Sequence, residues 1–209
     1  MRVLLLSPHT DDVELGAGGT LVKLLEDSSN DFCWAVFSIC EDAVPEGQPA
    51  DTLEQEFISV CSRLGIADRR IYHFPNKNLP EHRQEILDQL DNIRKEFRPD
   101  LVISPSLHDS HQDHRAIAEE TVRAFKREAS IIGYEMPWNN LVFAPQLLVR
   151  LTDEHMAAKW EAMCMYASQF ALKRGYFSRE LIFGWARMRG VGCNSEYAEA
   201  FEVIRWILS

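Results

Sequence analysis

The sequence predicts an α/β protein: a three-layer α/β/α sandwich in which helices cover both faces of a mostly parallel, Rossmann-like sheet. Two observations support this prediction. Short, continuously apolar segments that end in turn residues are typical of strands buried on both faces of a parallel sheet. Helical segments of a dozen or more residues separate these strands, and such alternation is typical of right-handed β-α-β units.

The first elements follow in order from the amino terminus. Residues 2–7 (RVLLLS) are almost continuously apolar, which predicts a central strand. A glycine-rich stretch at 16–19 leads into a segment with helical spacing at 20–27. Residues 32–40 return to a strand pattern rich in aromatic and branched side chains. Residues 41–50 contain two prolines and a glycine, so we expect a surface loop.

The middle of the chain repeats this alternation. A helical segment ends at Gly65, a residue suited to the left-handed conformation at a helix C-terminus. A short strand is predicted at 71–75. A second amphipathic helix lies between Pro80 and Pro99 and leads into an apolar strand at 101–105.

The last part of the chain adds further helices and strands. The pattern predicts a helix at 113–128 and a strand at 130–136. It then predicts an extended segment at 141–151, a helix after Thr152 and a final strand near 201–207. No internal repeat or low-complexity tract interrupts the series.

Length and composition limit the function classes. The 209 residues suit one domain spanning 1–209. With 32 acidic against 22 basic side chains the net charge is −10, so nucleic acid is not an expected partner. Five cysteines without a CxxC pair are typical of thiols in a reducing compartment, and no segment has the length needed to span a bilayer. We therefore expect a cytoplasmic protein without membrane insertion, and leave a homo-oligomer open.

Two polar segments follow predicted strands. Residues 7–19 (SPHTDDVELGAGG) follow the first strand, and residues 108–115 (HDSHQDHR) follow the strand at 101–105. Ligands of open α/β sheets bind at such carboxyl ends. A hydrolytic metal site needs about three imidazole or carboxylate ligands and an open position for water. The two segments together supply them as His9 and Asp12 from the first and His114 from the second.

Each segment alone also has a purely structural explanation. Carboxylates after a strand commonly cap the next helix, which would account for Asp11 or Asp113. His111 and His114 are three residues apart and can simply share an exposed helix face. Only the placement of both segments at two strand ends favours a metal site, with Asp11 or Asp113 then free to act as a base.

Both motifs resemble those of the LmbE-like or PIG-L-like metal-dependent N-deacetylases, whose hallmarks are Pro-His-Pro-Asp-Asp and a downstream His-x-Asp-His. In this chain they read Pro8-His9-Thr10-Asp11-Asp12 and His111-Gln112-Asp113-His114. The segments DDVELGAGGT, SRLGI, KWEAMCMYASQ and RGVGCNSEYAEAF also resemble the family in the right order, so the resemblance covers nearly the whole chain. Two departures are Thr10, in place of the usual proline, and Leu53, where many relatives are expected to have arginine.

The resemblance implies an activity and a set of roles. His9, Asp12 and His114 would bind the metal, and Asp11 would be the general base. Zinc is expected at such a mixed site, with Fe2+ or another divalent ion as the alternative. The implied reaction is hydrolysis of the N-acetyl group of an N-acetylglucosamine-type amino sugar, free, glycoside or conjugate, which releases acetate and an amine.

Three further expectations concern the rest of the site. A protonated His111, oriented by Asp113, is expected to stabilise the tetrahedral oxyanion. Trp138 is expected to line a sugar-binding groove or to form an oligomer contact. The glycines at 16–19 leave a second hypothesis, a non-enzymatic nucleotide- or sugar-binding module that retains the fold, although they do not form GxGxxG and also suit tight packing of a helix on the sheet.

Overall fold

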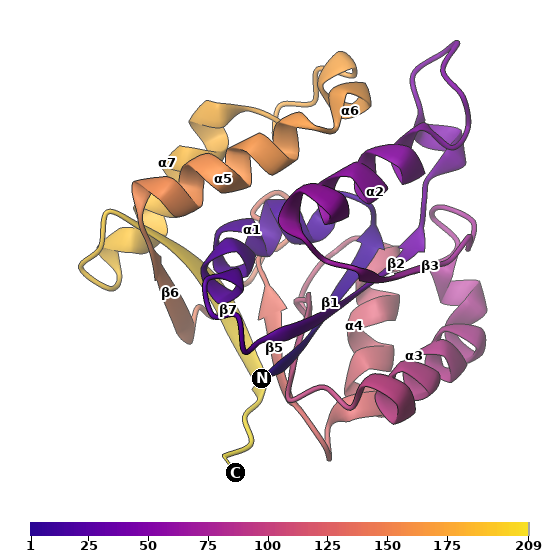
Figure 1. Ribbon diagram of the computed structural model, residues 1–209, viewed down its shortest axis with the longest axis horizontal. Helices are drawn as coiled ribbons and strands as arrows, with labels where there is room; N and C mark the ends of the chain where they lie inside the picture. The colour runs from indigo at the N-terminus through magenta and orange to yellow at the C-terminus, as the bar shows by residue number, and fades with distance from the viewer. Residues whose placement is uncertain (209) are drawn as a thin grey trace.

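The computed structural model describes residues 1–208, and its strands form a single seven-stranded sheet (Figure 1). The strands are β1 (Arg2–His9), β2 (Asp31–Ser38), β3 (Asp68–Ile71), β4 (Leu101–Pro105), β5 (Ser130–Tyr134), β6 (Leu147–Leu151) and β7 (Tyr197–Arg205). Their order is β3-β2-β1-β4-β5-β7-β6. All pairs from β3 to β5 are parallel, and β7 runs antiparallel to β5 and β6. The mostly parallel sheet confirms the predicted α/β class.

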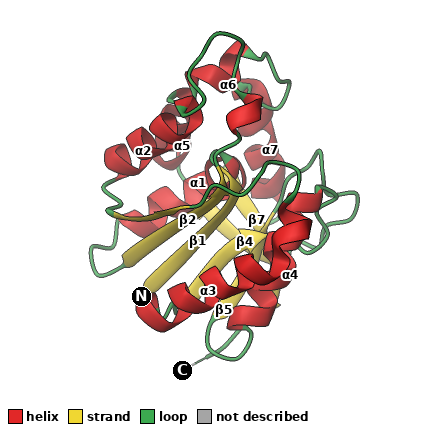
Figure 2. Cartoon of the chain, turned by 90° about the vertical axis from the view of Figure 1, so that its right-hand side faces the viewer, coloured by secondary structure: helices red, strands yellow, loops and turns green. Residues whose placement is uncertain are grey.

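Helices lie on both sides of the sheet, as Figure 2 shows. They are α1 (Asp12–Leu25), α2 (Thr52–Leu64), α3 (Arg83–Phe97), α4 (Gln112–Phe125), α5 (Asp153–Cys164), α6 (Ala167–Ala171) and α7 (Arg179–Val191), with short 3-10 turns at Glu41–Ala43 and Leu79–His82. Helices α3 and α4 cover one face, while α1, α2, α5 and α7 cover the other. Within residues 1–208 no helix is both long and apolar enough to cross a membrane.

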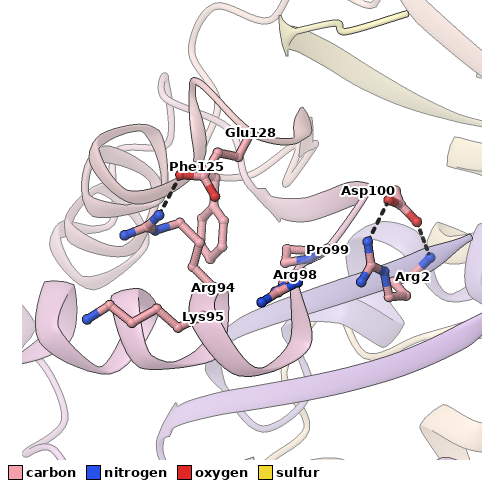
Figure 3. A pocket seen from close by; sticks show the side chains of 8 residues that line it. All are labelled: Arg2, Arg94, Lys95, Arg98, Pro99, Asp100, Phe125 and Glu128. Carbon is pink, nitrogen blue, oxygen red and sulfur yellow. Dashed lines mark hydrogen bonds and ion pairs between the residues drawn. The ribbon is translucent and has the colours of Figure 1, made fainter. Parts of the chain in front are cut away.

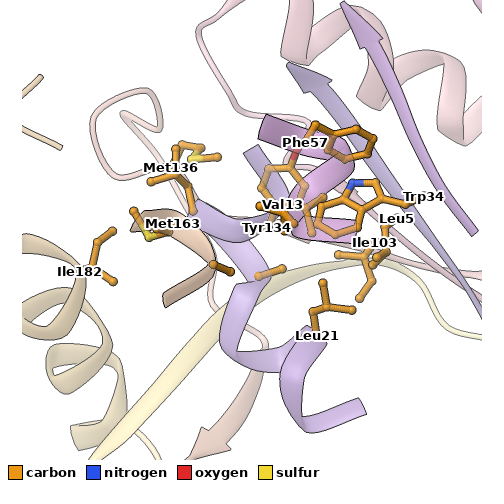
Figure 4. Close-up of a cluster of buried hydrophobic side chains, with 14 of the residues drawn as sticks. Leu5, Val13, Leu21, Trp34, Phe57, Ile103, Tyr134, Met136, Met163 and Ile182 are labelled. Carbon is orange, nitrogen blue, oxygen red and sulfur yellow. The ribbon is translucent and has the colours of Figure 1, made fainter. Parts of the chain in front are cut away.

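Strand β1 supplies side chains to both hydrophobic layers. Leu4 and Leu6 pack among the side chains of α3 and α4. Val3 and Leu5 point to the other face, where Figure 4 shows Leu5 near the ring of Trp34. The indole of Trp34 meets the ring of Phe57 edge to face at a centroid distance of 5.2 Å. Burial on both faces explains why the segment lacks polar alternation and reads as a central strand.

Helix α1 begins at Asp12, so the expectation of a glycine-rich stretch before a helix at residue 20 is wrong. The glycines at 16–19 lie inside the helix and against the sheet. A Cβ atom on Gly16 would lie 2.5 Å from the Tyr134 ring, and one on Gly19 would lie 2.5 Å from the Leu151 side chain. Their use is close packing, and no glycine loop remains there to receive a phosphate.

The structure differs from the predicted elements at three other places. The short strand lies at β3 and not at 71–75, and the extended segment at 141–151 forms a strand only over β6. After α5 the chain forms α6 and α7, which were not predicted. Helix α7 contains two glycines and several arginines, so its helical propensity and apolar pattern are both weak. Tertiary contact with β7, and not local sequence preference, stabilises it.

The close packing of α1 leads to a paired test of stability. Gly16→Ala should lower the free energy of unfolding by about 1–3 kcal/mol, because the new methyl group overlaps the buried Tyr134 ring. Gly184→Ala, in α7, meets nothing within 4 Å and should raise it by about 0.5–1 kcal/mol. Urea unfolding measures the change in the free energy of unfolding for both variants, provided that its dependence on urea concentration stays the same. Equal effects of the two substitutions would contradict the packing explanation.

Candidate metal centre

The two polar segments meet at the carboxyl ends of β1 and β4, where the order in which strands are added to the sheet reverses. Strand β1 pairs with β2 on one side and with β4 on the other: the chain runs outward from β1 to β2 and β3, and then crosses back over the sheet to β4. This is the topological switch point at which open α/β sheets bind ligands. His9 ends β1, and His114 lies in the first turn of α4 after β4. The two segments therefore come together, as their positions after two strands predict.

Three side chains form a triangle with the dimensions of a metal site. The distances from His9 Nδ1 to Asp12 Oδ2, from His114 Nε2 to Asp12 Oδ2, and from His114 Nε2 to His9 Nδ1 are all 3.3 Å. Ligands about 2.0–2.1 Å from a tetrahedral metal are separated from each other by roughly 3.3 Å. The donor atoms thus fit one face of such a coordination shell and leave its fourth position open.

Each of the two imidazoles is held by a second carboxylate. His9 Nε2 lies 3.0 Å from Asp113 Oδ2, and His114 Nδ1 lies 2.7 Å from Asp109 Oδ2. Both carboxylates are buried, so they fix the ring orientations and direct the remaining nitrogens at the common point. Asp109 was not assigned a role from the sequence, although it stands in the same HDSHQDH segment two residues before His111.

Asp113 corrects one expectation. Its carboxylate was expected to orient His111, but it contacts His9 and accepts the backbone N–H groups of Lys77 and Leu79 at 2.7 and 3.1 Å. Only the backbone N–H of Asp113 contacts the His111 ring, donating to Nδ1 at 3.2 Å. Asp113 therefore joins the β3–α3 loop to the metal triangle, and its side chain neither caps α4 nor bonds to His111.

The charges of the triangle depend on one another. Burial opposes protonation of both imidazoles, but the Asp12 charge and hydrogen bonds to carboxylates raise the pKa of His9 to about 9 and that of His114 to about 10. Burial would raise the pKa of Asp12, but the two imidazolium charges hold it well below its usual range. The buried carboxylates thus require positive charge at this point, which protons supply when no metal is bound.

The ring of His111 lies beside the triangle, 4.7 Å from that of His114 and 5.0 Å from that of His9, measured between ring centres. Burial, followed by the charges of His114 and His9, lowers its pKa to about 4. This lowered pKa favours the neutral ring over the protonated His111 that the sequence led us to expect. Because Nδ1 accepts the Asp113 N–H, the ring proton lies on Nε2. The neutral ring retains one N–H for hydrogen bonding.

Asp11 stands at the start of α1 but does not serve as a helix cap. It occupies the N-cap position, yet its side chain makes no capping hydrogen bond. The residue is buried at the cavity wall, and burial together with the neighbouring Asp12 charge raises its pKa to about 6. The structural explanation of Asp11 as a capping carboxylate is thus not supported, and its oxygens are free for a ligand.

A cavity of about 310 Å³ opens beside these residues. Trp138 lies in its wall, and its ring stacks on that of Tyr176 at a centroid distance of 4.6 Å with an interplanar angle of 14°. Gln169 and Arg174 line the same cavity. Sequence reasoning assigned no role to Tyr176 or Arg174, because the segment between α6 and α7 carries no recognisable motif.

A second hollow of about 320 Å³ lies at the other end of the strands, near the start of β1 (Figure 3). Arg2 pairs there with Asp100, and Arg94 pairs with Glu128. Arg2 and His9 are the two ends of β1, so about 23 Å of extended strand separates this hollow from the metal triangle. Basic side chains near the end of α3 interact favourably with the negative end of the helix dipole. This structural role accounts for them without a ligand.

Comparison with known proteins agrees with the geometry. The PIG-L family, GlcNAc-PI de-N-acetylase, matches residues 4–125, more than half of the chain. The chain is 31% identical to diacetylchitobiose deacetylase of Thermococcus kodakarensis, with 81% of this chain and 70% of that protein covered. It is 30% identical to the probable N-acetyl-alpha-D-glucosaminyl L-malate deacetylase 2 of Bacillus cereus, with 60% and 61% covered.

A solved structure shows the same fold over almost the full length. The conserved protein TT1542 from Thermus thermophilus superimposes with a TM-score of 0.79 at 27% identity, with 99% of this chain and 96% of that chain covered. Nothing in these comparisons supports a non-enzymatic module. The matched family and the relatives show that the chain belongs to the PIG-L (LmbE-like) family and is a deacetylase.

Proposed function

We propose that this deacetylase hydrolyses the N-acetyl group of an N-acetylglucosamine-type amino sugar, free or as a glycoside or conjugate. Its metal would be Zn2+ held by His9, Asp12 and His114, with Fe2+ as the alternative. The observation that carries the proposal is the 3.3 Å triangle of donor atoms beside an accessible cavity. The relatives support the substrate class, because their names describe deacetylation of N-acetylglucosamine derivatives.

The proposed chemistry divides between the metal and the protein. When bound, a divalent ion supplies a Lewis acid for the amide carbonyl and makes water more acidic. Asp11 takes the proton from the attacking water, since its carboxylate is buried, uncapped and at the cavity wall. The same carboxyl group then returns the proton to the departing amine nitrogen. Acetate and the free amino sugar are the products.

His111 supplies a hydrogen bond to the reacting carbonyl oxygen. Its Nδ1 is occupied by the Asp113 backbone N–H, so the Nε2–H group is free to donate. A neutral donor directed at developing negative charge is an oxyanion-stabilising group, and losing one typically lowers turnover by about 100-fold or more. Asp113 contributes indirectly: it bonds to His9 Nε2, on the far side of the ring, so that His9 Nδ1 faces the proposed metal.

The cavity wall suits a sugar ring. The stacked rings of Trp138 and Tyr176 offer an apolar surface next to polar groups, a combination that carbohydrates require. The five cysteines are all free, which supports a reducing compartment and hence our expectation of a cytoplasmic enzyme.

Replacing Asp11 separates the base from the metal site. Asp11→Asn should lower kcat for an N-acetylglucosamine derivative that the native enzyme hydrolyses by about 10²–10⁴-fold, because the amide cannot take a proton. Zinc content should stay near that of the native protein, since Asp11 is not part of the triangle. Amine release and elemental analysis measure the two effects. A D11N variant with full metal content and undiminished turnover would show that another group is the base.

A substitution of Asp109 tests the metal site while leaving all three proposed metal-binding residues unchanged. Asp109→Asn should weaken zinc binding by about 10–100-fold, because His114 loses the carboxylate that orients it. Asp88→Asn, the same change at an exposed position on α3, is the matched control and should bind zinc like the native protein. Competition with a chromophoric chelator measures both affinities. Equal affinities in the two variants would rule out this role of Asp109.

Metal binding should depend on pH in a defined direction. Below their pKa values of about 9 and 10, His9 and His114 hold protons that a metal must displace, so affinity should rise as pH increases from 6 to 9. Loading at pH 7 should release at least one proton. Calorimetry in buffers of different ionisation enthalpy counts the protons. Zinc binding without proton release would contradict the protonation described for the metal-free triangle.

A further inference from the structure

Arg174 is the cationic side chain that lines the cavity from the segment between α6 and α7. Its Nη1 donates to the Tyr176 hydroxyl at 2.6 Å, and its guanidinium lies 5.9 Å from the centre of the Tyr176 ring. Tyr176 in turn stacks on Trp138. The guanidinium is thus held in place by the aromatic wall, while most of its five N–H groups make no hydrogen bond to residues 1–208.

Comparison with the other half-buried arginines shows that Arg174 is unusual. The five others each hold a carboxylate within 4.0 Å: Arg2, Arg70, Arg83, Arg94 and Arg189. Within the described chain Arg174 has no carboxylate within 4.0 Å, and the charge of Asp11, which lines the same cavity, acts on it only from a greater distance. Every other arginine without a carboxylate partner in residues 1–208 is exposed to solvent.

A half-buried guanidinium without a carboxylate in direct contact loses hydration and gains little in return. In this chain, whose net charge is −10, carboxylates are plentiful, yet none within residues 1–208 forms an ion pair with Arg174 within 4.0 Å. The planar group remains free to bind a carboxylate or phosphate through two parallel hydrogen bonds. Lys77, from the β3–α3 loop, also lines the cavity without a carboxylate partner in the described chain, so the second cation there adds to the same field.

We infer that the substrate carries a carboxylate or phosphate group outside its N-acetyl sugar, and that Arg174 binds this group while the Trp138–Tyr176 wall contacts the sugar. The inference rests on the proposed function and narrows it from N-acetylglucosamine derivatives in general to anionic ones. Arg174 is in this account a specificity-determining residue that takes no part in the hydrolytic steps.

Three substrates and two variants test the inference in the zinc-loaded enzyme. The substrates are methyl N-acetyl-α-glucosaminide, which is neutral, its carboxymethyl counterpart, and N-acetylglucosamine 1-phosphate. Arg174→Gln removes the guanidinium charge from the cavity, and Arg127→Gln, the control, removes the same charge from an exposed arginine outside the cavity. The native enzyme should have a higher kcat/KM for at least one anionic substrate than for the neutral one. R174Q should reduce that ratio about tenfold or more, mainly through KM, and R127Q should preserve it.

Whichever anionic substrate is preferred shows whether the natural substrate carries a carboxylate or a phosphate. Added salt should weaken the preference for the anionic substrate. Equal kcat/KM for the neutral and both anionic substrates, or a preference that survives in R174Q, would overturn the inference. If no substrate is hydrolysed, the proposed function fails, and calorimetric binding of the same three compounds still tests the inference. Tighter binding of an anionic compound that is lost in R174Q but kept in R127Q would then support it, and binding unaffected by R174Q would overturn it.

Discussion

The structure is organised around one buried carboxylate, Asp12, placed between the imidazoles of His9 and His114. A charge in this position is costly unless positive charge stands next to it. The triangle therefore binds either protons or a metal, and the raised pKa values of the two histidines reflect the same requirement. Asp113 and Asp109 extend the negative charge behind the rings, which adds to the demand for positive charge at this point.

The position of Asp12 depends in turn on how closely α1 approaches the sheet. Gly16 and Gly19 permit that approach, and a buried ion pair stabilises it. Glu199 of β7 accepts the backbone N–H groups of Gly19 and Thr20 at 2.9 and 2.6 Å. Lys159 of α5 donates to the Leu15 carbonyl oxygen and to Glu199, at 2.7 Å each. The last third of the chain thus holds in place the helix that begins with Asp12.

Sequence reasoning was most successful where chemistry and position coincide. Strand β1 is apolar on both faces, and His9, Asp12 and His114 follow two parallel strands, so their meeting was predictable from the rules of parallel sheets. The hydrogen-bond partners of individual side-chain atoms could not be predicted in this way. Asp113 and His111 are close in sequence, but the Asp113 carboxylate turns to His9 because the β3–α3 loop supplies two backbone N–H groups on that side.

The cavity wall was less predictable for a different reason. Arg174 and Tyr176 lie between two helices with weak local signals, and their place beside Trp138 results from packing between segments far apart in sequence. The GAGG stretch was misplaced because glycine usually indicates a loop, whereas here it allows a helix to lie against a tyrosine ring. In both cases tertiary contact overrides the local pattern.

The most direct test of the central claim is the position of the metal itself. Anomalous diffraction at the zinc absorption edge, on crystals of the zinc-loaded protein, locates the ion without reference to activity. The account predicts a peak about 2.0–2.1 Å from His9 Nδ1, Asp12 Oδ2 and His114 Nε2. A fully occupied zinc ion held by other side chains, with this triangle empty, would contradict it.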